Sequence, residues 1–313
     1  MAQNYSTPLG LSTSWRTADS SDGNLLLDEI RETGIEALEL DYRLSSDELG
    51  QMKRRLKSSE FTVLTVHNYC PLPGGVSKSE ARGDLFLLSS TDPEQRLLAV
   101  RHSINTLRLA ADLEARAVVF HLGGVEMDEE RDRLIAFYDR NEIGSERHSE
   151  WLQGKLAERA RCCARHFDAV LKSLDALNEE AFRLGVLIGA ENRYRYTQIP
   201  FAHEFDILFK EFAGGLIRYW HDVGHAEIFH RLGILDHEKD LLARLAPHLI
   251  GMHIHDLNGL RDHIAPGTGD FNFSRLSRYM NPGIIPILEV HGSADATDLR
   301  NSVQLLKAAS IPE

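Results

Sequence analysis

The sequence is short of cysteine, with only Cys70, Cys162 and Cys163 among 313 residues. An odd and sparse set does not form a disulfide framework, and we expect the adjacent pair Cys162 and Cys163 to be buried as small apolar side chains. No apolar run approaches the length of a membrane span. The first residues lack a basic segment followed by an apolar one, so no signal peptide is predicted. We therefore expect a cytoplasmic protein with no membrane partner.

Positive charge is also scarce, because 35 Lys and Arg stand against 47 Asp and Glu and leave a net charge of −12. Such a surface repels phosphate backbones on average, which disfavours nucleic acid as a partner. The glycine-rich dinucleotide fingerprint is missing after the first predicted strand, and we expect no organic cofactor. Low-complexity tracts, linkers and long internal repeats are missing too. The 42% hydrophobic share is enough for a large core.

Short apolar strands alternate with amphipathic helices along the chain, which predicts parallel strands joined by crossover helices. The strands are expected at residues 9–14, 35–43, 61–69, 117–124, 186–192, 216–224, 249–256 and 284–292. The main helices are expected at about 25–33, from 45 onward, and at 93–115, 150–185 and 296–309, with a charged insertion at 126–149 that holds a short helix at 132–138. Eight strand–helix units predict an α/β fold, a (β/α)₈ TIM barrel formed by residues 1–313 as a single domain. A doubly wound open sheet is the alternative.

Every predicted strand from the third to the eighth carries a His, Asp or Glu near its end. In order, these residues are His67, His121, Glu191, Asp222, His255 and Glu289. The C-terminal strand ends of such a barrel face one cavity, so residues far apart in sequence converge. Converging carboxylates repel one another, and a divalent cation removes that cost. We therefore predict one metal ion (Mn²⁺, Mg²⁺, Co²⁺ or Zn²⁺) held by Glu191, Asp222, His255 and Glu289.

Simpler explanations exist for these residues. Asp222 could be a helix N-cap, a role that is compatible with ligation through its other oxygen. His225 could reach the same cavity from the first helical turn or be exposed. His253 lies on the same side of its strand as His255, and we expect it to pack beside the ligands. Glu191 and Glu289 could be surface carboxylates.

His67 and His121 are open to three explanations: metal ligand, substrate partner or satisfied interior histidine. The loop after the seventh strand adds further candidates in HDLNGLRDHIAPGTGDFNF. Arg261 could hold an anionic or hydroxylated substrate through paired hydrogen bonds. Asp262 and His263 could be ligands or could shape the loop.

The segments ENRYRYTQIP, YWHDVGHAE, MHIHDLNGLRDHIAPGTG and ILEVHG resemble the xylose-isomerase-like TIM barrel superfamily, over nearly the whole chain. That group includes sugar phosphate isomerases and epimerases, inosose dehydratase and the endonuclease IV group. By this resemblance, the one-metal ligands of keto-sugar 3-epimerases fall on Glu191, Asp222, His255 and Glu289, and two substrate-binding residues fall on His225 and Arg261. Thr197 stands where those enzymes have a substrate-contacting Glu, so the chain departs from the 3-epimerase pattern.

The resemblance implies a metal-dependent isomerase or epimerase of carbohydrate metabolism that acts on a sugar, sugar phosphate or keto-polyol. Glu191 and Glu289 would move a proton next to a carbonyl through a metal-stabilised enediolate. The substrate would be bound by His67, His121, His225, Arg261 and His263. The resemblance also admits a homo-oligomer.

Three other functions stay open. An endonuclease IV-like apurinic-site nuclease with a three-zinc cluster would use His67, His121, His225 and His263, but Arg261 stands where that group has an Asp. A keto-inositol dehydratase would begin with the same proton abstraction. A non-catalytic sugar-binding barrel would bind metal and ligand without turnover.

Overall fold

Residues 7–311 of the protein are described by a computed structural model. Eight strands form a closed ring in the order β1-β10-β7-β6-β5-β4-β3-β2, and each neighbouring pair is parallel. The strands are β1 (Gly10–Ser12), β2 (Ala37–Leu40), β3 (Thr62–His67), β4 (Ala117–Phe120), β5 (Leu187–Glu191), β6 (Ile217–Asp222), β7 (Leu249–Ile254) and β10 (Ile285–Leu288). Because β1 pairs with β10, the ring is closed. The predicted (β/α)₈ barrel is confirmed and the open sheet is excluded.

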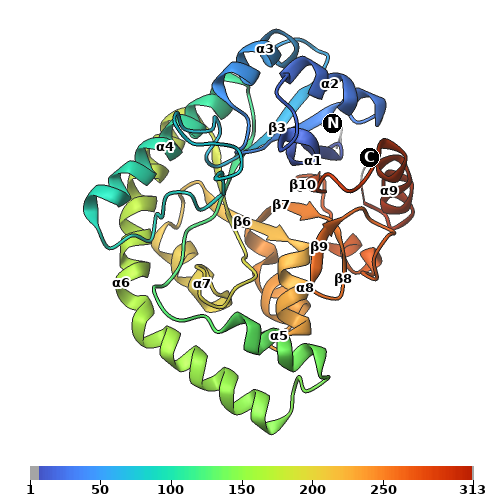
Figure 1. Ribbon diagram of the computed structural model, residues 1–313. Coiled ribbons are helices and arrows are strands. Elements are labelled where there is room, and N and C mark those ends of the chain that lie inside the picture. The colour runs from blue at the N-terminus through green and yellow to red at the C-terminus, as the bar shows by residue number, and fades with distance from the viewer. Residues whose placement is uncertain (1–6, 312–313) are drawn as a thin grey trace.

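Helices surround the ring of strands (Figure 1). They are α1 (Ser14–Thr17), α2 (Gly23–Glu32), α3 (Ser46–Leu56), α4 (Pro93–Asp112), α5 (Arg131–Asp139), α6 (Glu146–Leu184), α7 (Ala202–Glu211), α8 (Val223–Arg231) and α9 (Ala296–Ala308). The predicted helix start at residue 45 is a capping box. Ser45 Oγ accepts the backbone N–H of Glu48, and the Glu48 carboxylate accepts the backbone N–H of Ser45.

The interior of the barrel is filled by an apolar cluster around Trp220. Its buried members are Ala37, Leu64, Ala117, Val119, Trp220, Ile285 and Ile287. Glycine makes room for the indole, since a Cβ on Gly251 would lie 2.2 Å from Trp220 Cζ3. The indole ring lies 5.1 Å from the imidazole of His253, measured between ring centroids. The apolar filling therefore ends where the polar side chains of the barrel mouth begin.

The charged insertion is shorter than predicted. Its short helix is α5, and residues 146–149 belong to α6, so the long helix begins four residues before its expected start at about residue 150. The helix starts earlier because Ser145 Oγ accepts the backbone N–H of His148 at 3.2 Å. From there α6 runs for 39 residues to Gly185, whose positive φ of 71° ends it. In Figure 1, α5 and the first part of α6 extend well beyond the ring of strands.

The loop after β7 contains a hairpin that the sequence analysis did not predict. Strands β8 (Asp256–Asn258) and β9 (Arg261–Ile264) pair antiparallel in a separate sheet. The buried Asp256 carboxylate holds this loop together. It accepts backbone N–H bonds from Leu257, Gly267, Gly269 and Phe271, at 2.9, 2.9, 3.0 and 3.0 Å. A Cβ on Gly269 would lie 2.4 Å from Asp256 Oδ1, so only glycine allows this close approach of the backbone to the carboxylate.

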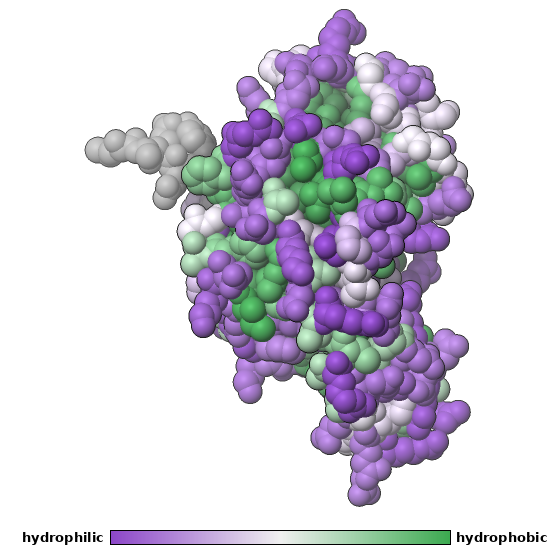
Figure 2. Space-filling view, turned by 90° about the vertical axis from the view of Figure 1, so that its left-hand side faces the viewer, coloured by the Kyte–Doolittle hydropathy of each residue, from purple (hydrophilic) through white to green (hydrophobic). Residues whose placement is uncertain are grey.

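Polar residues cover most of the face on the side of α4 and α6, with apolar patches between them (Figure 2). Among residues 7–311, no helix is long and apolar enough to cross a membrane. The expectation of no signal peptide depends in part on residues 1–6, which lie outside the described residues. Cys70 and Cys163 are buried free thiols, and Cys162 is half-buried.

Candidate metal centre

Three buried carboxylates meet at the C-terminal mouth of the barrel. Glu191 and Asp222 are the last residues of β5 and β6, and Glu289 directly follows β10. One ligand atom from each of them and one from His253 lie within 4.8 Å of one another. In a second group, one ligand atom each from Asp222, Glu289, His255 and His263 also lie within 4.8 Å of one another. The structure therefore places the four predicted ligands in two overlapping groups that share Asp222 and Glu289.

His253 occupies the middle of the carboxylates. Its Nδ1 lies 2.7 Å from Glu191 Oε1 and 3.0 Å from Glu289 Oε2, and its Nε2 lies 3.1 Å from both oxygens of Glu39. Burial opposes a charged imidazole, but the facing carboxylates Glu289 and Glu39 hold the pKa of His253 well above its usual value. A protonated His253 therefore offsets part of the negative charge at the centre. His253 is thus more than the packed neighbour of the ligands that its place on the strand predicts.

Glu39 is a member of the centre that the sequence analysis missed. It lies on β2, is fully buried, and accepts a hydrogen bond of 2.9 Å from Thr65 Oγ1 in addition to its contacts with His253. The same signal that marked strands three to eight could have found it, because LELD in the second predicted strand carries an acidic residue that faces the barrel interior.

The carboxyl groups of Glu191, Asp222 and Glu289 all have pKa values well below their usual range. Burial alone would raise these values, but positive and imidazole neighbours outweigh it. For Glu191 the largest favourable interaction is with the guanidinium of Arg193, and for Glu289 it is with His253. The carboxylates are therefore ionised at neutral pH. Ionised oxygens together with imidazole nitrogens form a donor set that suits a divalent cation.

The ends of β5 and β6 are tied together by the side-chain amide of Asn192. Its Oδ1 accepts the backbone N–H of Asp222 at 2.8 Å, and its Nδ2 donates to the backbone carbonyl of Asp222 at 3.0 Å. The hydroxyl of Tyr219 donates to the same Oδ1 at 3.0 Å. Asp222 itself caps α8, because its Oδ1 accepts the backbone N–H of His225 at 2.7 Å. The predicted N-cap role is confirmed, and the second carboxylate oxygen, Oδ2, lies 3.2 Å from His255 Nε2.

The structure brings four of the five predicted substrate-binding residues to the centre. His67 and His121 form a further close group with Glu191. The buried His225 stacks on Tyr194, with ring centroids 4.7 Å apart.

The two remaining residues lie in the loop after β7. His263 stacks on His255 at 4.1 Å between ring centroids, and its Nε2 lies 3.5 Å from Glu289 Oε2. Arg261 is different, because its side chain is exposed and lines a separate surface cavity.

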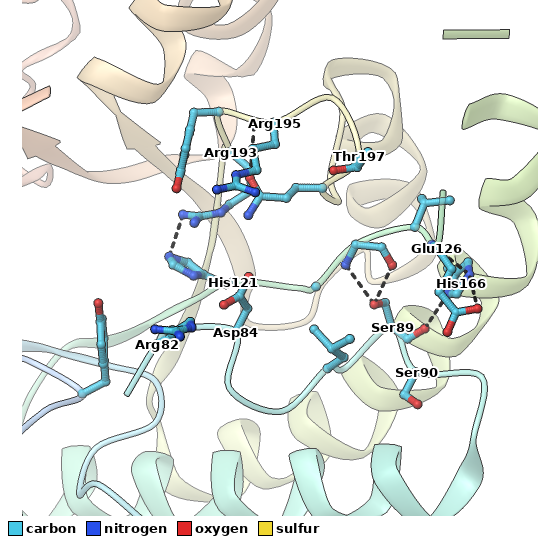
Figure 3. Close-up of a pocket in the computed structure, with 18 residues that line it drawn as sticks. Arg82, Asp84, Ser89, Ser90, His121, Glu126, His166, Arg193, Arg195 and Thr197 are labelled. Atoms are coloured by element: carbon cyan, nitrogen blue, oxygen red, sulfur yellow. Dashed lines mark hydrogen bonds and ion pairs between the residues drawn. The ribbon is translucent and has the colours of Figure 1, made fainter. Parts of the chain in front are cut away.

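A cavity of about 500 Å³ opens beside the centre (Figure 3). His121 and Arg193 belong both to its wall and to the groups around Glu191. In Figure 3, Arg193 lies on one side of His121 and Arg82 on the other, while Glu126 is at the far end. A ligand in this cavity would reach the carboxylates past His121 and Arg193.

Arg193 is the second residue that the sequence analysis missed. Its Nη1 donates to Glu191 Oε2 and to His121 Nε2 (2.6 Å), and its side chain is only 5% exposed. The sequence signal that could have found Arg193 is its position two residues after Glu191, the last residue of β5. A buried guanidinium here adds a fixed positive charge to the carboxylate-rich mouth.

The family model described as "Xylose isomerase-like TIM barrel" matches residues 27–309. The chain belongs to this family. The resemblance inferred from the strand-end motifs is thus confirmed. No curated protein sequence matches the chain.

Solved structures of other proteins have the same fold. The 3-keto-D-glucoside 4-epimerase YcjR from E. coli has 16% identity and a TM-score of 0.63, covering 96% of this chain and 99% of its own. The D-psicose 3-epimerase from Clostridium cellulolyticum H10 has 13% identity and a TM-score of 0.65, covering 97% and 100%. The TTHB071 protein from Thermus thermophilus has 21% identity and a TM-score of 0.62, covering 97% and 98%. At these identities the likeness shows a shared fold.

Proposed function

We propose that the protein is a divalent-metal-dependent isomerase or epimerase that acts on a sugar, a sugar phosphate or a keto-polyol. The observation that carries the proposal is the convergence of the ionised, buried carboxylates Glu191, Asp222 and Glu289 beside a cavity of about 500 Å³. Solved structures with the same fold that are named as sugar epimerases support this class of reaction. The intact donor set argues against a barrel that only binds sugar.

The metal would be held by Glu191, Asp222, His255 and Glu289. When bound, a divalent cation polarises a carbonyl group and offsets the negative charge that develops when the neighbouring carbon loses its proton. His253 would then change its partners, because its imidazolium and a metal ion would compete for the same oxygens of Glu191 and Glu289. This competition makes metal affinity rise with pH.

Glu191 and Glu289 would exchange the proton with the substrate carbon. They come from β5 and β10, which are separated in the ring by β6 and β7, so they approach the centre from different directions. One carboxylate can remove a proton from one face of a carbon while the other returns it to the opposite face. His121, in the cavity wall, would bind a substrate hydroxyl, and His225, which stacks on the cavity residue Tyr194, would bind another.

The test is solvent deuterium exchange into a panel of ketoses, ketose phosphates and keto-inositols with the metal-loaded protein. Glu191→Gln and Glu289→Gln should each lower the exchange rate by about 10²- to 10⁴-fold, the usual contribution of a general acid or base. Glu211→Gln, at the exposed end of α7, is the matched control and should keep the wild-type rate. Undiminished exchange in both site variants would refute the mechanism. Release of water from a keto-inositol would identify a dehydratase instead.

A further inference from the structure

A second group of metal-ligating atoms lies next to the main centre. His67 at the end of β3, His121 after β4 and Glu191 at the end of β5 place one ligand atom each within 4.8 Å of one another. Glu191 has its two oxygens turned to different partners. Oε1 lies 2.7 Å from His253 in the main centre, and Oε2 lies 2.7 Å from His121 Nε2. A carboxylate placed in this way can bridge two cations, so these residues alone would suit a second ion.

A positive group of the chain itself already occupies this place. Arg193 Nη1 donates to Glu191 Oε2 and to His121 Nε2, the two atoms that a second ion would need, and it lies 3.5 Å from His225 Nδ1. A metal ion bonded to His121 Nε2 at about 2.0–2.2 Å would lie no farther than about 5 Å from Nη1. The two positive charges would repel strongly there, because the guanidinium is buried and little water can screen it.

The position of Arg193 is fixed by the backbone next to it. Asn192, which precedes it, is bonded to both backbone groups of Asp222. The guanidinium also lies over the ring of Tyr194, with Cζ 5.7 Å from the ring centroid. Asn192 cannot move without breaking the hydrogen bonds that link the ends of β5 and β6. Arg193, the next residue, is therefore held against Glu191 and His121. It is not a surface side chain that a metal ion would displace at little cost.

We propose that the guanidinium of Arg193 replaces a second metal ion and makes the centre mononuclear. The proposal rests on the proposed metal-dependent function, since it presumes a first ion at the carboxylates. An arginine differs from a second ion in that it neither dissociates nor exchanges. The chain thereby keeps a permanent positive charge beside Glu191 without building a metal cluster. This arrangement fits chemistry on one carbonyl–hydroxyl pair and disfavours the multi-zinc nuclease alternative.

The experiment compares the number of Zn²⁺ ions bound per chain in wild type and Arg193→Ala, by calorimetric titration of chelator-stripped protein and by elemental analysis after desalting. We expect the variant to bind one ion more than wild type. Arg195→Ala is the matched control, because Arg195 lines the same cavity but pairs with Glu129 at 3.1 Å, and it should keep the wild-type count. The double variant Arg193→Ala with His121→Ala should lose the additional ion.

Wild type that binds two or more ions at saturation, or an Arg193→Ala count equal to that of wild type, would overturn the proposal. Thermal unfolding establishes that each variant is folded, and Arg193→Ser, a small polar replacement, takes the place of Arg193→Ala if that variant aggregates. The difference between variant and wild type tests the role of Arg193. The wild-type count tests the proposed function separately, because a chain that binds no ion would contradict metal dependence whatever Arg193 does.

Discussion

Replacing Asp256 should cost stability in proportion to the number of backbone hydrogen bonds that are lost. The carboxylate accepts four N–H groups, two on each oxygen, and is only 1% exposed. Asp256→Ala removes all four acceptors, and at about 1 kcal/mol for each net hydrogen bond we expect a loss of about 4 kcal/mol. Asp256→Asn can keep the two bonds made by one oxygen, so the loss should be about 2 kcal/mol.

Thermal unfolding monitored by circular dichroism measures these losses. For a chain of this size, each kcal/mol corresponds to roughly 2 °C in Tm, so decreases of about 8 °C for Asp256→Ala and 4 °C for Asp256→Asn are expected. Asp270→Asn in the same loop is the control. Asp270 is 58% exposed and pairs with Arg231, and such surface pairs contribute at most about 1 kcal/mol. If Asp256→Asn shifted Tm no more than this control, the carboxylate would not be what holds the loop.

Three further outcomes are expected. Gly251→Ala should destabilise the protein by about 1–3 kcal/mol in urea unfolding, because the new Cβ would collide with Trp220. Gly50→Ala, at an exposed helical position with open space around it, should instead stabilise the protein by about 0.5–1 kcal/mol. Burial and the neighbouring His121 lower the pKa of His67 to about 3. The metal-free protein should therefore lose stability as the pH falls from 6.5 towards 3, by roughly 4 kcal/mol for this group. In His67→Gln, a plot of Tm against pH should have a smaller slope over this range. A chelator should lower Tm and added Mn²⁺ should restore it, with about 2.7 kcal/mol of stabilisation when free metal is 100 times its Kd; an unchanged Tm would argue against a bound ion.

The architecture could be predicted from sequence because its signals are local. Each buried strand is a short apolar run, and helix starts such as Ser45 carry their own capping residues. The expected strands correspond to the eight of the ring, with ends trimmed by up to four residues. The hairpin after β7 could not be seen in this way. It depends on Asp256 receiving N–H bonds from residues up to 15 positions later, a pattern with no period.

The composition of the site could be predicted only in part. The rule that acids and histidines stand at strand ends found Glu191, Asp222 and Glu289, whose convergence follows from barrel topology alone. The rule cannot say which of two alternating histidines lies among the carboxylates, because His253 and His255 both face inward and differ only in depth. Arg193 was missed because arginine after a strand is most often exposed. Its burial depends on contacts with Glu191 at the end of β5 and with His121 after the neighbouring strand β4, and the 70 positions that separate His121 from Glu191 hide this proximity in the sequence.

The amide of Asn192 has a consequence for the choice of ion. By bonding to both backbone groups of Asp222, it fixes the distance between the ends of β5 and β6, and so the spacing of two of the proposed ligands. Carboxylates on mobile loops would adjust to whichever ion arrives, whereas ligands on a rigid frame strain ions whose radius does not suit the gap. Discrimination among Mg²⁺, Mn²⁺, Co²⁺ and Zn²⁺ would then depend on the link between two neighbouring strands. Exchanging Asn192 would weaken this discrimination although every ligand residue is kept.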